Sequence, residues 1–108
     1  MYQLNELEHR WGERFQLDLP VQLAVNTVSG IDARLKNLSL SGALIEADFA
    51  LRIHTVIDIK LPMRLHAQPA IVVKAYVIRK FNEEVGIEWR DFAPHAIKEL
   101  LRSLATKS

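Results

Sequence analysis

The sequence contains no cysteine, so it can form neither a disulfide framework nor a thiolate metal site. It has no apolar run near the roughly 18 residues that a membrane helix requires. Its first residues, MYQLNELEHR, lack the apolar core of a secretory signal. We therefore expect a cytoplasmic protein without membrane insertion.

An excess of charge of one sign is also missing. Fourteen basic and thirteen acidic side chains leave a formal net charge of +1. A protein that binds DNA or RNA through bulk positive charge is therefore not expected. Any site for an anion has to be local.

Patterns that carry catalysis or hold metals are absent as well. The sequence has no Walker A loop and no G-x-G-x-x-G, and its adjacent carboxylates Glu83 and Glu84 fall in a predicted turn. Ser39 and Ser41 have no histidine in a recognisable nucleophile arrangement. The histidines lack the H-x-x-x-H or H-x-H spacing of a zinc site; they are His9, His54, His66 and His95. The sequence predicts no enzyme, no metal and no cofactor.

The length of 108 residues and the hydrophobic fraction of 49% favour one folded domain. Leu4 and Leu7 among polar neighbours suit a short helical turn, and Gly12 weakens its continuation. We interpret residues 1–18 as a flexible N-terminal arm with few apolar anchors, and residues 19–108 as the folded domain.

Strand patterns begin at Leu19. Val21, Leu23 and Val25 alternate with polar or small residues, as in a half-buried strand. Ser29-Gly30 is a turn signal, and alternation from Ile31 predicts the second strand of a hairpin. Further strands are expected over 43–47, 56–61, 70–79 and 85–89, with a loop over 48–55 that has some apolar anchors and a turn over 82–84.

The C-terminal segment has a helical pattern. Asp91 is a candidate cap with Pro94 in the first turn. An apolar stripe at helical spacing follows; its members are Ile97, Leu100, Leu101 and Leu104. Because strands and helices do not alternate, a parallel sheet is not expected. The fold class is therefore all-β: a six-stranded antiparallel β-barrel with a C-terminal α-helix that covers one opening or side.

The first chemistry-bearing string is R-x-x-x-R, formed by Arg10-Trp11-Gly12-Glu13-Arg14. A guanidinium offers a rigid fork of donors that fits a phosphate or the O6/N7 edge of guanine. Two arginines four residues apart can therefore hold one phosphate and one base edge. The alternative is a solvated basic pair on a short helix.

The second string is N-x-S-x-x-G, formed by Asn37-Leu38-Ser39-Leu40-Ser41-Gly42. Asn37 and Ser39 supply acceptors for the guanine edge that carries N–H donors, and their spacing of two puts them on one face. Gly42 allows a ligand to approach the backbone or the chain to turn with positive φ. The alternative is a strand end with an Asx or Ser turn and a bulge glycine.

A hairpin between the two strings returns the chain near its starting level, so the strings can meet. In this order the pair resembles the PilZ family. Two further blocks resemble the late strand pair of that family: Tyr76-Val77-Ile78-Arg79 and Val85-Gly86-Ile87-Glu88-Trp89. The resemblance covers most of the chain and implies a PilZ-type split barrel.

The resemblance also implies a ligand, the bacterial second messenger cyclic di-GMP. Arg10 and Arg14 match the arginines expected to grip guanine and phosphate. Asn37, Ser39 and Gly42 match the positions expected to hold the other guanine edge. His9 stands where members that bind an intercalated ligand dimer tend to have another arginine, so one ligand per site is favoured.

Three further side chains stay open at this stage. Arg79 can reach a phosphate or simply be a charged strand end. Trp89 can stack on a base or pack in the core or against the helix. Trp11 can stack on the ligand or cover the barrel.

The leading hypothesis is a receptor whose arm, residues 1–18, is stapled to the barrel when cyclic di-GMP binds and which then signals to a partner protein in trans. The resemblance implies control of motility, exopolysaccharide synthesis or biofilm formation. The alternative is a PilZ-fold protein-interaction adaptor with weak or no nucleotide binding. An oligonucleotide-binding barrel would need a basic, aromatic-lined groove, which the near-neutral charge and 7% aromatic content disfavour.

Overall fold

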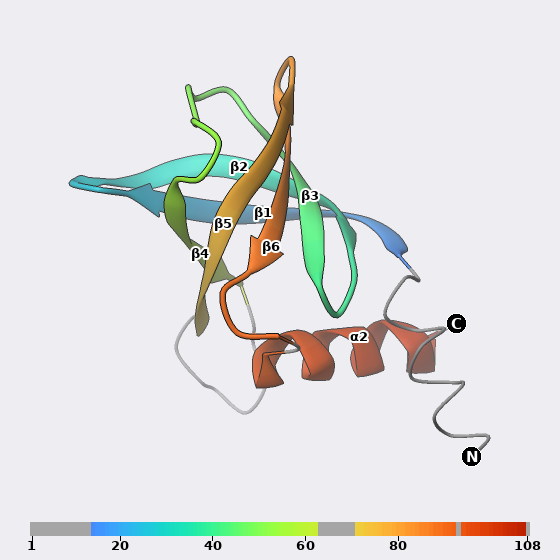
Figure 1. Cartoon of the computed structure of the whole chain (residues 1–108). Coiled ribbons are helices and arrows are strands. Elements are labelled where there is room, and N and C mark those ends of the chain that lie inside the picture. The colour runs from blue at the N-terminus through green and yellow to red at the C-terminus, as the bar shows by residue number, and fades with distance from the viewer. Residues whose placement is uncertain (1–13, 63–70, 93, 108) are drawn as a thin grey trace.

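The computed structural model describes residues 14–62, 71–92 and 94–107. Within these residues the predicted all-β barrel with a C-terminal helix is confirmed (Figure 1). The elements are β1 Phe15–Val25, β2 Val28–Leu38, β3 Gly42–Ala47, β4 Val56–Leu61, β5 Ile71–Phe81, β6 Glu84–Trp89 and α2 His95–Lys107. The described helix is neither long nor apolar enough to cross a membrane.

The six described strands form one closed antiparallel barrel in the order β1-β2-β3-β6-β5-β4. Pairing of β1 with β4 closes the ring, as in Leu23↔Ile59. Every other side chain along each strand points inward, and Leu23, Leu35, Ile45 and Ile59 are almost completely buried. Burial of each such side chain contributes about 1.5–3 kcal/mol, so the alternation seen in the sequence is what holds the barrel together.

Strand β1 begins earlier than predicted. It starts at Phe15 rather than Leu19, because Phe15 and Gln16 pair with Leu38 and Asn37 of β2. Residues 15–18 of the predicted arm therefore belong to the barrel. Residues 1–13, the rest of that arm, lie outside the described residues.

The β1–β2 hairpin is confirmed, but the expected turn at Ser29-Gly30 is wrong. Val25 pairs with Val28, so the turn is Asn26-Thr27, with Asn26 in the left-handed region at φ 56°. Two-residue hairpin turns need positive φ, which asparagine tolerates. Gly30, at φ 72°, lies inside β2 where the register slips, and so occupies a bulge.

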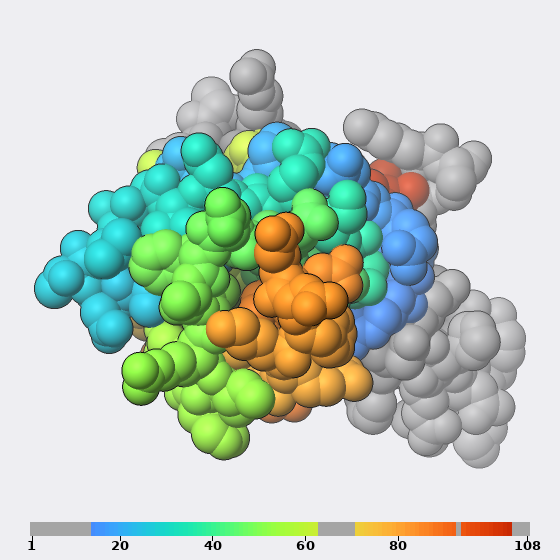
Figure 2. Space-filling model, turned by 90° about the horizontal axis from the view of Figure 1, so that it is seen from above, coloured from blue at the N-terminus to red at the C-terminus, as the bar shows by residue number. Residues whose placement is uncertain are grey.

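The end of the barrel opposite α2 is covered by the β3–β4 loop, where the sequence predicts apolar anchors. Leu51 is such an anchor, with 1% of its surface exposed. The N–H of His54 donates to the Val77 carbonyl at 2.6 Å, and the N–H of Ala47 donates to the Glu83 carbonyl at 2.9 Å. Figure 2 accordingly shows the green loop lying against the orange β5–β6 hairpin.

That hairpin is tighter than predicted. Phe81 pairs with Glu84, so Glu84 belongs to β6 and the turn contains only Asn82 and Glu83. Asn82 has a φ of 56°, the same left-handed conformation as Asn26 in the first hairpin.

Helix α2 lies across the other end of the barrel (Figure 1) and buries Ile97 and Leu101 against the core. The predicted cap is wrong: the residue before the helix is Pro94, whose carbonyl accepts the N–H of Lys98 at 3.0 Å. Asp91 lies further upstream, and its carboxylate is 3.7 Å from Arg90 Nη2.

Candidate functional site

The two sequence strings meet on the outer face of the barrel. Arg14 Nη1 donates a hydrogen bond of 2.9 Å to Asn37 Oδ1, although the two residues are 23 positions apart. Their contact follows from the β1–β2 register, in which Gln16 is the partner of Asn37. Arg10 and Trp11, the other members of R-x-x-x-R discussed above, lie outside the described residues.

Ser39 is buried at the start of the β2–β3 turn, with 1% of its surface exposed. Its Oγ accepts the N–H groups of Ser41 and Gly42 at 3.3 and 3.2 Å, and its own N–H donates to the Gly42 carbonyl at 2.9 Å. In this conformation the Ser39 hydroxyl holds the turn together and does not face solvent.

Of the three described glycines, Gly42 has the closest neighbouring backbone, and that backbone belongs to β6. A Cβ added to it would stand 2.0 Å from the carbonyl oxygen of Ile87 and 3.2 Å from the Cα of Glu88. Its φ is not positive, so the prediction that Gly42 lets the chain turn with positive φ is wrong, whereas the Ser turn of the alternative is present at Ser39. The group that approaches the Gly42 backbone in the structure is strand β6.

Trp89 connects the end of β6 to the same turn. Its ring is buried, with 3% of the residue exposed, and its indole N–H donates to the Ser39 carbonyl at 3.1 Å. Its backbone N–H donates to the Ser41 carbonyl, also at 3.1 Å. Core packing of Trp89 is therefore confirmed. Its second role could have been sought from the sequence, because a buried indole N–H usually finds an acceptor.

Replacing Trp89 with phenylalanine is expected to lower the free energy of unfolding by about 1–3 kcal/mol, because the buried Ser39 carbonyl loses its donor. Urea denaturation measures the change. Phe81→Tyr, at an exposed aromatic side chain, serves as the matched control and is expected to unfold like wild type. An unchanged midpoint for Trp89→Phe would show that the indole hydrogen bond does not support the turn.

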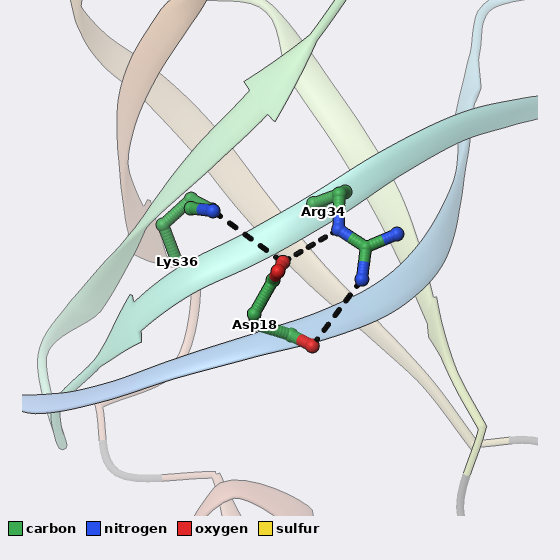
Figure 3. Close-up of polar contacts among 3 residues, drawn as sticks. All are labelled: Asp18, Arg34 and Lys36. Atoms are coloured by element: carbon green, nitrogen blue, oxygen red, sulfur yellow. Dashed lines mark hydrogen bonds and ion pairs between the residues drawn. The ribbon is translucent and has the colours of Figure 1, made fainter.

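Next to Asn37 the outer face of β1 and β2 carries a cluster of charges (Figure 3). Asp18 Oδ1 lies 2.5 Å from Arg34 Nε and 3.4 Å from Lys36 Nζ, and Arg34 Nη2 also donates to the Asp18 carbonyl at 3.4 Å. The hydrogen bond from Arg34 is the main cause that lowers the pKa of the Asp18 carboxyl. The small stabilisation of the folded state by the Asp18–Arg34 pair is therefore present at neutral pH and is lost as pH falls through that lowered pKa.

Two register shifts bring this cluster to Asn37. The β1–β2 pairing slips between Gln16 and Leu19, and the β2–β3 pairing slips between Leu35 and Asn37. As a result Lys36 and Asn37 are both partly exposed, although they are consecutive strand residues. The face around Asn37 thus carries the cations Arg14, Arg34 and Lys36, together with the carboxylate of Asp18 and that of Glu46, which is the β3 partner of Arg34.

Metal coordination finds no support in the part of the chain that the structure describes, where no three His, Asp or Glu side chains gather. His54 and His95 are exposed on separate elements, and His9 and His66 lie outside the described residues. Arg79, which the sequence left open, is exposed on β5 and pairs with Gly86 of β6.

Comparison with known proteins identifies a family and a fold. A family model, PilZ domain, matches residues 8–106. The crystal structure of the PilZ domain of CeSA from a cellulose-synthesizing bacterium has a TM-score of 0.69 at 19% identity and covers 87% of this chain and 99% of that one. No curated protein matches the chain.

Two other solved structures are similar. The Bacillus subtilis inhibitor of motility, MotI/DgrA, has a TM-score of 0.65 at 22% identity and covers 87% of this chain. The match covers 48% of MotI, so the chain spans about half of that protein. An uncharacterized Legionella protein has a TM-score of 0.51 at 12% identity, covering 87% of this chain and 91% of that one. At these identities the matches support the fold.

Proposed function

The chain belongs to the PilZ domain family, which binds cyclic di-GMP, and we propose that this protein is a receptor for that dinucleotide. The observation that carries the proposal is the hydrogen bond between Arg14 and Asn37. It places a guanidinium and an amide, the two group types that recognise opposite edges of guanine, side by side on an exposed surface.

The chemistry of these two groups fits an anionic guanine nucleotide. The Arg14 fork can bind a phosphate or the O6/N7 edge in bidentate fashion. The amide oxygen of Asn37 has two lone pairs, so it can accept an N–H of the base while it keeps its bond to Arg14. Arg14 is an exposed cation on this face, which favours an anionic ligand.

Ser39 and Gly42 complete the proposed site, and their surroundings suggest how they act. Ser39 shapes the turn that follows Asn37, and Gly42 allows β3 to approach β6. We propose that both residues contribute by positioning the backbone beside Asn37, whereas Arg14 and Asn37 contact the ligand directly.

Arg10 supplies the second arginine of the proposed clamp. Because β1 begins at Phe15, the part of the proposed arm that responds to ligand precedes the barrel, and Arg10 belongs to it. We propose that cyclic di-GMP binding docks this segment onto the barrel, a disorder-to-order switch whose new surface meets a partner protein in the bacterial cytoplasm.

Isothermal titration calorimetry and thermal melting test the receptor. Cyclic di-GMP at a hundred times its dissociation constant is expected to add about 2.7 kcal/mol to the free energy of unfolding. Cyclic di-AMP and single-stranded RNA serve as controls and are expected to leave the melt unchanged, because adenine lacks the guanine edges. A melt that responds to RNA but not to cyclic di-GMP would contradict the receptor and support an oligonucleotide-binding barrel.

A second function, an adaptor that binds protein without nucleotide, is favoured by one observation. Ser39 and Gly42 have structural roles in the turn that would persist without any ligand. This adaptor is supported if calorimetry detects no nucleotide and a pull-down recovers the same partner with and without cyclic di-GMP.

A further inference from the structure

A single row of paired residues runs from the Arg14–Asn37 contact across three more strands. In this row Asn37 pairs with Leu44, Leu44 with Gly86, and Gly86 with Arg79. Directly paired residues point to the same face of a sheet. Leu44 lies between buried Ala43 and Ile45, so the row is on the outer face.

The third member of this row, Gly86, has no side chain, and the Arg79 side chain covers it. A Cβ added to Gly86 would lie 3.6 Å from the Cβ and 3.7 Å from the Nε of Arg79. The Arg79 side chain therefore lies back over Gly86, toward β6, and this explains why Gly86 is buried although it is on the outer face. The register shift between Val77 and Arg79 turns Arg79 to this face.

Arg79 forms no ion pair among the described residues. Arg34, Lys74 and Arg90 each have a carboxylate within 4 Å, whereas Arg79 has no such partner there. Strands in a sheet are about 4.8 Å apart, so Asn37 and Gly86, two strands apart, are separated by about 10 Å. A ligand with charged or aromatic groups at both ends can engage both arginines.

We propose that Arg79 forms the far wall of the nucleotide site and contacts the second nucleotide of cyclic di-GMP across the partly exposed Leu44. This inference rests on the proposed receptor function and extends it. One nucleotide is held by Arg14 and Asn37, and the other reaches the Arg79 guanidinium, which can stack on a purine or bind a phosphate.

Calorimetry with cyclic di-GMP on the full chain tests the far wall with three variants. Arg79→Ala is expected to weaken binding at least tenfold. Gly86→Val is expected to weaken it similarly, because a branched side chain displaces Arg79 from its place over Gly86 while the charge is kept. Lys80→Ala is the matched control, since Lys80 pairs with buried Val85 and so points to the other face. Its affinity is expected to change less than twofold.

The outcomes separate this inference from the receptor itself. Suppose that wild type binds cyclic di-GMP, Arg14→Ala does not, and Arg79→Ala binds like wild type. The proposed contact of Arg79 with the ligand is then wrong, and the proposed receptor function is unaffected. If Lys80→Ala weakens binding as much as Arg79→Ala, the effect is general charge attraction and the far wall is again wrong. If wild type does not bind the dinucleotide, both proposals fail. Thermal melts without ligand establish that each variant is folded.

Discussion

Replacing Arg14 with alanine is expected to weaken cyclic di-GMP binding about 100-fold while the fold stays intact. Hydrogen bonds to charged groups contribute about 1.5–3 kcal/mol each, and loss of a bidentate pair worth about 3 kcal/mol corresponds to about two orders of magnitude in affinity. Arg14 is exposed and outside the core, so the free energy of unfolding is expected to change by less than about 0.5 kcal/mol. Calorimetry and urea denaturation measure the two quantities.

A matched control for this variant is Arg52→Ala. Arg52 is an exposed arginine in the β3–β4 loop, so its removal changes the net charge equally without touching the Arg14–Asn37 contact. Its affinity is expected to equal that of wild type. If Arg14→Ala binds cyclic di-GMP as tightly as Arg52→Ala does, the arginine clamp is wrong.

Replacing Gly42 with alanine is expected to lower the free energy of unfolding by about 3 kcal/mol, the upper part of the range for overpacked sites. The new methyl group would stand 2.0 Å from the Ile87 carbonyl oxygen, and this neighbour is backbone, which cannot rotate away. Relief requires β3 and β6 to separate and their hydrogen bonds to weaken. The midpoint of urea denaturation measures the loss.

Gly86→Ala is the control for stability. Gly86 lies on β6 and pairs with Leu44 of β3, the strand that carries Gly42. A Cβ added to Gly86 would make only ordinary contacts of 3.6 and 3.7 Å with Arg79. A change below about 1 kcal/mol is expected, because neither contact is short enough to cause strain. Equal denaturation midpoints for the two variants would rule out the close approach of β3 and β6 as the reason for glycine at position 42.

The ligand response of Gly42→Ala distinguishes the two roles considered for this residue. If Gly42 only positions the backbone, the fraction that stays folded at low temperature binds cyclic di-GMP with an affinity close to that of wild type. If the ligand itself approaches Gly42, affinity falls even in the folded fraction. Calorimetry at a temperature where the variant is folded, established from its melt, measures this.

Much of the barrel could be predicted because its strands are locally encoded. Alternation at Val21, Leu23 and Val25 identifies a strand with one buried face, and the structure buries all three. Element ends were less predictable. The early start of β1 depends on pairing of Phe15 with Leu38, a partner more than twenty positions away, and local patterns do not report such partners.

The first turn illustrates a different limit. Ser29-Gly30 has the composition of a turn, yet the chain turns at Asn26-Thr27, and Gly30 occupies a bulge with φ 72°. A glycine satisfies the need for positive φ in a turn or a bulge equally well. Which of the two it occupies depends on the register that buries Leu23 and Ala33 inside the barrel.

By itself the amino-acid sequence determined a single barrel domain, its closing helix, and two polar strings at neighbouring strand ends, because hydrophobic period and chain order are local properties. Only the tertiary structure decided which polar groups remain exposed. The Ser39 hydroxyl and carbonyl are occupied by the turn and by Trp89, fifty positions away, whereas Arg14 and Asn37 stay at the surface. A buried polar atom needs a partner, and closure of the barrel determines which atoms are buried.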